Sequence, residues 1–173
     1  AETTVKEGAG LLLVSRTLSE LEAAKSALQK HGGKVEICQA DISRKEDVSK
    51  INALLKEKFN NQVDVLINAA GIYGAIGPIT ENDPEEWRKT LNVNLFGTFL
   101  MIRAIAPLMK NQKHGKIINF VGGGEGALPH FSGYAASKGG IVRLNETVAE
   151  ELKEFNIDVN AIVPGAVNTK FLD

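Results

Sequence analysis

Val63-Asp64-Val65-Leu66-Ile67-Asn68-Ala69-Ala70-Gly71 is an apolar, β-branched run that ends in small residues. Its first part, Val63–Asn68, is continuously apolar at its centre, which is typical of a strand buried on both faces of a parallel sheet. Four similar runs occur elsewhere in the chain, at Leu11–Ser15, Val35–Ala40, Lys116–Val121 and Asp158–Val163. The sequence therefore predicts five strands of a parallel sheet.

Stretches of helical period separate these runs. Their starts are predicted by two capping boxes and one Asp-Pro pair: Thr17 with Glu20, Ser43 with Glu46, and Asp83 with Pro84. The third helix is expected to continue to Lys113 with a disturbance near Pro107, and the last long helix is expected over Ser132–Phe155. This alternation predicts one α/β domain with a doubly wound parallel sheet over residues 1–173. A short, complete flavodoxin-like domain is the alternative.

Composition and charge exclude several classes of protein. Hydrophobic residues make up 43% and charged residues 24% of the chain, which excludes wholesale disorder. Twenty Lys and Arg against 21 Asp and Glu give a net charge of −1, so no nucleic-acid partner is expected. A single cysteine, Cys38, allows no internal disulfide and no cysteine-based zinc site, so we expect no metal and a reducing, cytoplasmic location. No apolar run approaches the ~18 residues of a membrane span, so no membrane association is expected.

Both ends of the chain are expected to be incomplete. Residues 1–9 have the pattern of a helix tail that leads into the Leu11 strand, and the end at Asp173 follows a Pro-Gly turn that normally leads onward. The glycine-rich loop Gly122–Gly126 follows a predicted strand, as a phosphate-binding loop does. Its spacing is not G-x-G-x-x-G and no helix start follows it, so a tight turn with close backbone approach is favoured over a phosphate site.

Several polar residues occur where an α/β sheet places its ligands. Tyr134 and Lys138 are four residues apart in a predicted helix and share one face, where a nearby ammonium favours the phenolate of a group with a pKa of ~10. Asn94 lies in an apolar helical stretch, where a buried asparagine must find hydrogen-bond partners. Asn68–Gly71 and Pro164-Gly165-Ala166-Val167-Asn168-Thr169 both follow predicted strands, at the carboxyl ends where such sheets bind ligands.

Together and in this order, the Asn-Ala-Ala-Gly turn, the helix asparagine, Tyr-x-x-x-Lys and Pro-Gly-x-Val-x-Thr resemble the short-chain dehydrogenase/reductase family over essentially the whole chain. The resemblance implies a Rossmann-like fold and an oxidoreductase that interconverts a small-molecule alcohol and a carbonyl with a nicotinamide cofactor. It implies that Tyr134 is the general acid/base, that Lys138 lowers its pKa and holds the nicotinamide ribose, and that Asn94 anchors a water of the proton relay. It also implies a homodimer or homotetramer built on the two long helices.

The resemblance further implies a set of cofactor contacts. These are Ser15, Arg16, Asp41, Ile42, Asn68, Ala69, Ala70, Gly71, Tyr134, Lys138, Pro164, Gly165 and Thr169. An arginine after the Leu11 strand suits a 2′-phosphate, and Leu12–Thr17 contains no carboxylate that could accept a ribose hydroxyl. NADP(H) is therefore preferred, with NAD(H) as the alternative. For Asp41, a capping or turn role is the other interpretation.

The sequence departs from the family pattern in three places. The glycine-rich pyrophosphate loop and its strand are absent, which predicts a gap in the sheet between the Leu11 and Val63 strands. The carboxyl-terminal region that normally covers the substrate is also absent. The position of the family's catalytic serine holds Val121, for which Ser132 or a backbone N–H of Gly122–Gly124 is a weak substitute. The alternative function is therefore a related protein that binds nucleotide or a partner with little catalysis.

Overall fold

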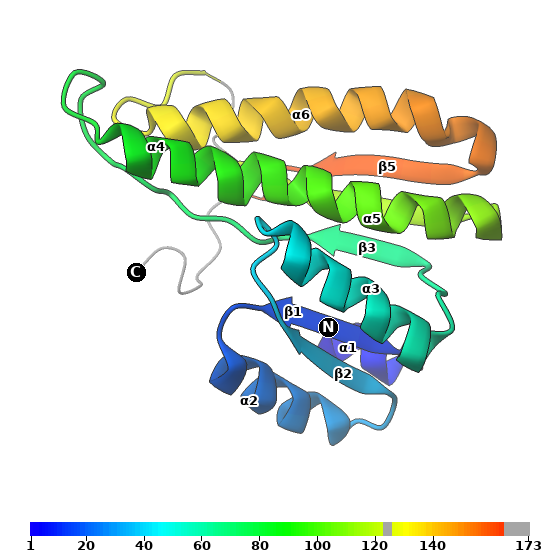
Figure 1. Ribbon diagram of the computed structural model, residues 1–173. Helices are drawn as coiled ribbons and strands as arrows, with labels where there is room; N and C mark the ends of the chain where they lie inside the picture. The colour runs from blue at the N-terminus through cyan, green and yellow to red at the C-terminus, as the bar shows by residue number, and fades with distance from the viewer. Residues whose placement is uncertain (123–125, 165–173) are drawn as a thin grey trace. The chain divides into compact units, whose positions relative to one another are not determined.

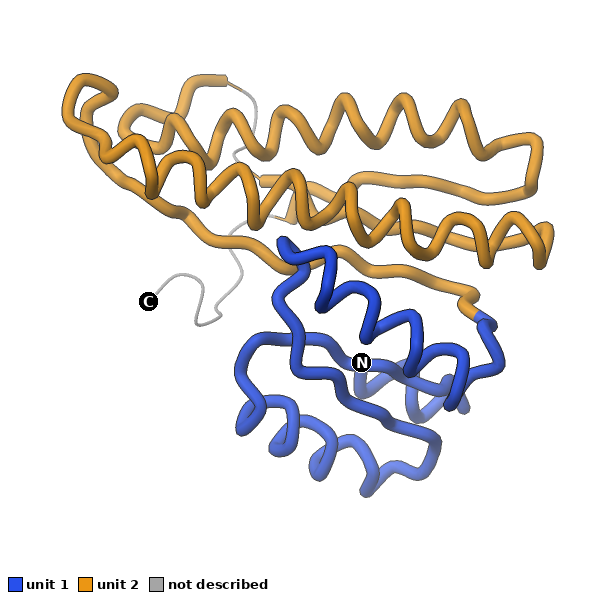
Figure 2. Tube along the Cα trace, in the orientation of Figure 1, with its two compact units in different colours: residues 1–62 blue, residues 63–173 orange. Residues whose placement is uncertain are grey.

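The structure, a computed structural model, describes residues 1–122 and 126–164. The chain divides into two compact units, residues 1–62 and residues 63–173 (Figure 2). Pro164 is the last described residue, and the predicted cofactor residues Gly165 and Thr169 lie outside the described part of the chain. The expectation of one domain over residues 1–173 stays a prediction.

Unit 1, residues 1–62, contains a two-stranded parallel sheet and three helices (Figure 1). Its elements are α1 (Glu2–Lys6), β1 (Leu11–Ser15), α2 (Leu18–Gln29), β2 (Val35–Gln39) and α3 (Lys45–Phe59). Leu11 lies opposite Val35, and Ser15 lies opposite Gln39. One apolar cluster of this unit contains Val5, Leu11, Leu13, Leu28 and Val35. Both predicted strands and the helix before them are confirmed.

The helix starts in unit 1 differ from the predicted capping boxes. Thr17 is the N-cap of α2, as expected, but its side chain makes no cap hydrogen bond. The helix α3 begins at Lys45, and Ser43 instead donates its N–H and its hydroxyl to Oδ1 of Asp41, at 2.9 and 2.6 Å. The capping box at Ser43 is therefore wrong, because a local turn uses this hydroxyl before the helix begins.

Unit 2 contains a three-stranded parallel sheet in the order β3–β4–β5. Its elements are β3 (Val65–Asn68), α4 (Pro84–Leu91), a π-helical segment (Asn92–Phe96), α5 (Gly97–Gln112), β4 (Gly115–Phe120), α6 (Ser132–Leu152), a 3₁₀ turn (Lys153–Phe155) and β5 (Ile157–Ile162). The described strands thus form two sheets, and the predicted gap between the strands that begin at Leu11 and near Val63 stays a prediction.

The sheet of unit 2 is buried on one face. The helices α5 and α6 pack on it (Figure 1), and Leu66, Ile117 and Val159 are buried. The alternate residues Val65 and Ile67 of β3 are 47% and 54% exposed. The parallel pairing is confirmed, but the expectation of burial on both faces is wrong for β3, because Val65 and Ile67 alternate with the buried Leu66 and so lie on the face opposite α5.

The long helical stretch after Asp83 is continuous but changes type. Asp83 caps it as predicted, since its carboxylate accepts hydrogen bonds from two backbone N–H groups of the first turn. The irregularity is the π-helical segment Asn92–Phe96, whereas Pro107 lies inside α5. The prediction of a disturbance at Pro107 is wrong. Both Pro107 and Arg103 are exposed, so the Arg103 carbonyl that loses its helical donor can be hydrated.

This same stretch corrects the expectation about apolar runs. Pro84–Gln112 is the helical stretch, within the described part of the chain, that is long and apolar enough to cross a membrane by length and composition, since it contains an 18-residue window with a mean hydropathy of 1.4. Half of the window is buried in the structure, and Met101, Ile105 and Met109 are among its core residues. A core helix of a soluble protein has the same properties.

Candidate active site

Tyr134 and Lys138 lie on one side of α6, and they are 8% and 5% exposed. The Lys138 Nζ donates a hydrogen bond of 2.8 Å to the carbonyl of Phe120, the last residue of β4. The same nitrogen lies 5.6 Å from the centroid of the Tyr134 ring. The two side chains therefore come together at the carboxyl end of β4, which is where the sequence predicts them.

Two glycines allow these groups to approach the backbone. A Cβ on Gly122 would overlap the Tyr134 hydroxyl. A Cβ on Gly71 would lie 3.4 Å from Asn94 Oδ1 and 3.6 Å from Lys138 Nζ. The predicted close backbone approach in the glycine-rich loop is thus found at its first residue. Gly71 borders both the asparagine and the lysine.

The Asn94 side chain is fully buried and holds three partners. Its Oδ1 accepts the Ile72 N–H at 2.8 Å, and its Nδ2 donates to the Ile72 carbonyl and to Ser137 Oγ, each at 2.9 Å. Ser137 in turn donates to the carbonyl of Tyr134 at 2.7 Å. A water anchored by Asn94 would therefore have to bond the second lone pair of Oδ1 or the backbone carbonyl, which also accepts the Thr98 hydroxyl at 2.7 Å.

A buried ladder of three asparagines fixes the Asn68 side chain. Asn68 Nδ2 donates to Asn119 Oδ1 at 2.9 Å, and Asn119 Nδ2 donates to Asn145 Oδ1 at 2.8 Å. Asn145 Nδ2 donates to the Val159 carbonyl at 3.4 Å, so the ladder connects β3, β4, α6 and β5. Asn68 therefore braces the sheet with its side chain, and the exposed Ala69–Ala70 continues the turn. Asn119 and Asn145 were missed, although a polar residue in an apolar run is the signal for such a bond.

Burial sets the protonation of the two central groups. Burial raises the pKa of Tyr134, and the neighbouring phenol of Tyr73 raises it further. Burial also lowers the pKa of Lys138. The pKa of Tyr134 is raised overall, with burial as the largest cause, and the expectation that Lys138 lowers it stays a prediction. Tyr134 is therefore protonated at neutral pH, which is the form that donates a proton.

The serine position of the family is filled by an aliphatic side chain. Val121 is 4% exposed, and its N–H donates to the Ile162 carbonyl at 3.0 Å. Ser132 Oγ accepts hydrogen bonds from Asn82 Nδ2 and Trp87 Nε1, each at 3.1 Å. Ser132 thus joins α6 to the start of α4, and the structure does not support it as a substitute for the serine.

The predicted adenosine contacts lie at one end of the unit 1 sheet. Ser15 ends β1, and the exposed Arg16 follows it, with its carbonyl accepting a hydrogen bond of 2.9 Å from Gln39 Nε2. Asp41 and Ile42 form the turn after β2. Asp41 Oδ1 accepts two hydrogen bonds within that turn, which supports its interpretation as a turn residue. The guanidinium of Arg16 is the group of this set that suits an anion.

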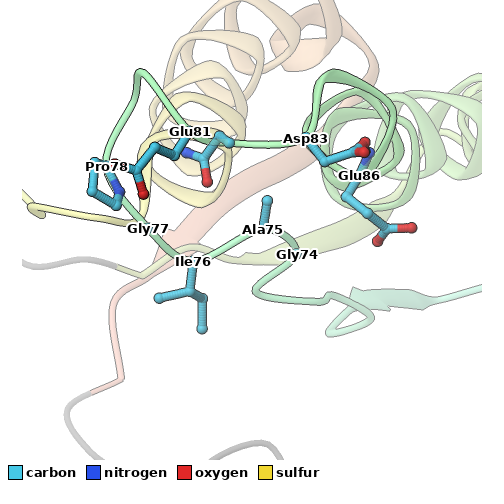
Figure 3. A pocket seen from close by; sticks show the side chains of 9 residues that line it. Gly74, Ala75, Ile76, Gly77, Pro78, Glu81, Asp83 and Glu86 are labelled. Atoms are coloured by element: carbon cyan, nitrogen blue, oxygen red, sulfur yellow. The ribbon is translucent and has the colours of Figure 1, made fainter.

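A pocket of about 370 Å³ lies next to the turn after β3. It is lined by residues 74–78, 81–83 and 86, and Figure 3 shows the carboxylates of Asp83 and Glu86 on its α4 side. Asp83 caps α4, and Glu86 pairs with Lys89 at 3.1 Å. The residues predicted for catalysis do not line this pocket. Within residues 1–122 and 126–164, no three His, Cys, Asp or Glu side chains gather where they could hold a metal ion.

Comparison with known proteins covers the whole chain. The family model of short chain dehydrogenases matches residues 1–173. An uncharacterised oxidoreductase of Staphylococcus saprophyticus is 35% identical over 171 residues, which cover 98% of this chain and 72% of that protein. The chain spans 60–72% of the length of five curated relatives.

Two solved structures show the fold and the kind of nucleotide that such proteins bind. The crystal structure of NAD⁺-bound xylitol dehydrogenase has a TM-score of 0.93 and 29% identity, over 99% of this chain and 66% of that chain. A metagenomic short-chain oxidoreductase in complex with NADP has a TM-score of 0.89 and 31% identity, over 96% of this chain and 75% of that chain. The expected Rossmann-like α/β fold is confirmed by these similarities.

Proposed function

The chain belongs to the short-chain dehydrogenase family, and on that premise we propose that the whole protein is a nicotinamide-dependent oxidoreductase that interconverts an alcohol and a carbonyl. One observation carries the proposal. Tyr134 and Lys138 are buried together at the carboxyl end of β4, and Gly71 borders both Asn94 and Lys138. An acid/base group next to a buried cation is the arrangement that proton transfer to a carbonyl oxygen requires.

The residues present fit the ribose of a nicotinamide nucleotide. An ammonium has three N–H donors, and the Phe120 carbonyl takes one donor of Lys138, so two can bind neighbouring hydroxyls. Gly71 leaves the space beside the Lys138 Nζ open, because it has no side chain there. When bound, the nicotinamide supplies or accepts the hydride.

The chain's own residues account for the proton. The raised pKa keeps Tyr134 protonated, so this phenol is ready to donate its proton to the oxygen of a carbonyl as the alcohol forms. The Lys138 ammonium then stabilises the phenolate that remains. Ser137 and Asn94 position the backbone of Tyr134 through their hydrogen bonds.

The test is reduction of a carbonyl by the whole protein with NADPH or NADH. Tyr134→Phe removes only the hydroxyl, so we expect it to abolish turnover while cofactor affinity stays within about twofold. Cofactor affinity is measured by calorimetric titration. Unchanged turnover in this variant would place the acid/base group elsewhere.

A second function, binding with little catalysis, is favoured by the buried Val121 at the serine position. Loss of one hydrogen-bond donor to a reacting oxygen costs on the order of 10²–10³ in rate. We expect Val121→Ser to increase a slow basal turnover rate by up to about 10²–10³-fold. A whole protein that binds nucleotide but shows no turnover, with or without this change, is a binding protein instead.

We propose NADP(H) as the preferred cofactor because the exposed Arg16 follows β1, and its guanidinium can donate paired N–H groups to a 2′-phosphate. Arg16→Ala should weaken NADP(H) binding by about tenfold or more and leave NAD(H) binding nearly unchanged. Equal losses for the two nucleotides in calorimetric titration would reject this preference.

We also propose that the whole protein is a homodimer or homotetramer through its long helices. Phe96 and Phe99 are exposed and stacked, with ring centroids 5.9 Å apart, and Val142 of α6 is also exposed. Exposed aromatic side chains of this kind favour a protein partner. A monomer in light scattering at micromolar concentration would contradict this proposal.

A further inference from the structure

The segment 71–77 crosses the candidate site with both ends fixed, and we call it the strap. At its start, both polar backbone groups of Ile72 bond the Asn94 side chain, at 2.8 and 2.9 Å. At its end, the Gly77 N–H donates to the His130 carbonyl at 2.9 Å. The strap is therefore held by the π-helical segment on one side and by the approach to α6 on the other.

The middle of the strap is also fixed. Gly74 has a φ of +72°, and a Cβ there would overlap the Thr90 side chain, so the backbone lies directly on α4. Thr90 is fully buried and donates its hydroxyl to the Glu86 carbonyl at 2.9 Å. Tyr73 lies between these anchors, so its ring has a defined place before any substrate arrives.

That place is against the catalytic ring. The Tyr73 ring centroid lies 5.0 Å from that of Tyr134, with an interplanar angle of 52°. It lies 5.6 Å from that of Phe131, edge to face at 66°. Tyr73 and Phe131 are only half-buried. Tyr73 thus lies against the phenol that we assign to proton transfer, Phe131 packs on Tyr73, and we call these two partly exposed rings the aromatic wall.

We propose that Tyr73 is a specificity-determining residue that selects substrates whose reacting carbon is part of, or attached to, a flat ring. This inference rests on the proposed role of Tyr134. A carbonyl oxygen must come within about 3 Å of the phenol to receive its proton, which brings the adjoining carbon skeleton to the neighbouring rings. Aromatic rings gain most from offset or edge-to-face contact with another ring. Because the strap is fixed, little ordering entropy opposes this contact.

The experiment compares two ketones of eight carbons, acetophenone and 2-octanone, with the whole protein. Dissociation constants are measured by ligand-observed NMR, and kcat/KM is measured by NADPH or NADH oxidation. The variants are Tyr73→Leu, which removes the ring, and Tyr73→Phe, which keeps it. Phe131→Leu removes the other ring of the wall from a different segment and replaces Tyr73→Leu if that variant does not fold.

We expect Tyr73→Leu to weaken acetophenone binding about three- to tenfold and to lower its kcat/KM by the same factor. Tyr73→Phe should stay within about twofold of the wild type, and 2-octanone should be unaffected by either change. Equal effects on the two ketones, no effect on either, or no binding of acetophenone by the wild type would overturn the assignment. A wild type that binds acetophenone more tightly than 2-octanone but turns over neither ketone would contradict the proposed activity. It would still support the role of the aromatic wall in selecting ligands with a ring.

Discussion

Replacement of Asn94 by alanine tests the framework of the site without any assay of activity. The change removes one acceptor and two donors, which bond the Ile72 N–H, the Ile72 carbonyl and Ser137 Oγ at 2.8–2.9 Å. The side chain and Ser137 are both fully buried, so bulk solvent does not reach the Ser137 hydroxyl. The Ile72 groups are only partly buried, so each lost partner costs about 1 kcal/mol, near the lower end of the range for unsatisfied groups. The expected loss is about 3 kcal/mol in the free energy of unfolding of unit 2.

The assay is urea unfolding followed by tryptophan fluorescence. The chain has a single tryptophan, Trp87, which lies on α4 and bonds Ser132 of α6, so its signal reports unit 2. Asn92→Ala is the matched control, because Asn92 belongs to the same π-helical segment but is exposed. The control should change stability by less than about 0.5 kcal/mol. A loss below about 1 kcal/mol for Asn94→Ala, or an equal loss for both variants, would refute the reasoning.

Three further results are expected. Gly122→Ala should push the Tyr134 hydroxyl out of place and lower kcat/KM on the order of 10²-fold, with a urea midpoint close to that of the wild type. Gly139→Ala, where a Cβ meets nothing within 4 Å, should raise the urea midpoint and add about 0.5–1 kcal/mol to stability. A hydrogen bond to Asp64 raises the pKa of His114, so its stabilising effect is present below about pH 6.5 and is lost as the pH rises through the raised value. Urea midpoints of wild type and His114→Gln should therefore differ at about pH 5.5 and converge at about pH 8.5, and the opposite trend would contradict this assignment.

The elements of the fold follow largely from local patterns. The strand Leu11–Ser15 has the predicted bounds, and the start of α4 is the predicted Asp83 cap. These predictions succeed because they depend on neighbouring residues in the chain. Ser43 shows the limit of the same method, since an equally local turn competes for its hydroxyl.

Part of the candidate site could also be predicted from local spacing, and part could not. A spacing of four on a helix is enough to place Tyr134 and Lys138 on one face. It does not tell which carbonyl the lysine bonds, and the Phe120 partner is 18 residues away in the sequence. The overall rise of the Tyr134 pKa could not be predicted from spacing either, because it depends on burial by the surrounding elements.

The sequence by itself therefore determined the α/β order of elements, the shared helix face of Tyr134 and Lys138, and the presence of Val121 where the family pattern has a serine. Only the tertiary structure decided that Tyr73 packs on Tyr134 and that Gly122 borders the Tyr134 hydroxyl. It also decided that the Asn94 side-chain amide bonds Ile72 and Ser137. The physical reason is range. Periodicity and capping act over a few residues, whereas Asn94 reaches Ile72 across 22 positions and Ser137 across 43, and such contacts exist only once packed elements bring distant side chains together.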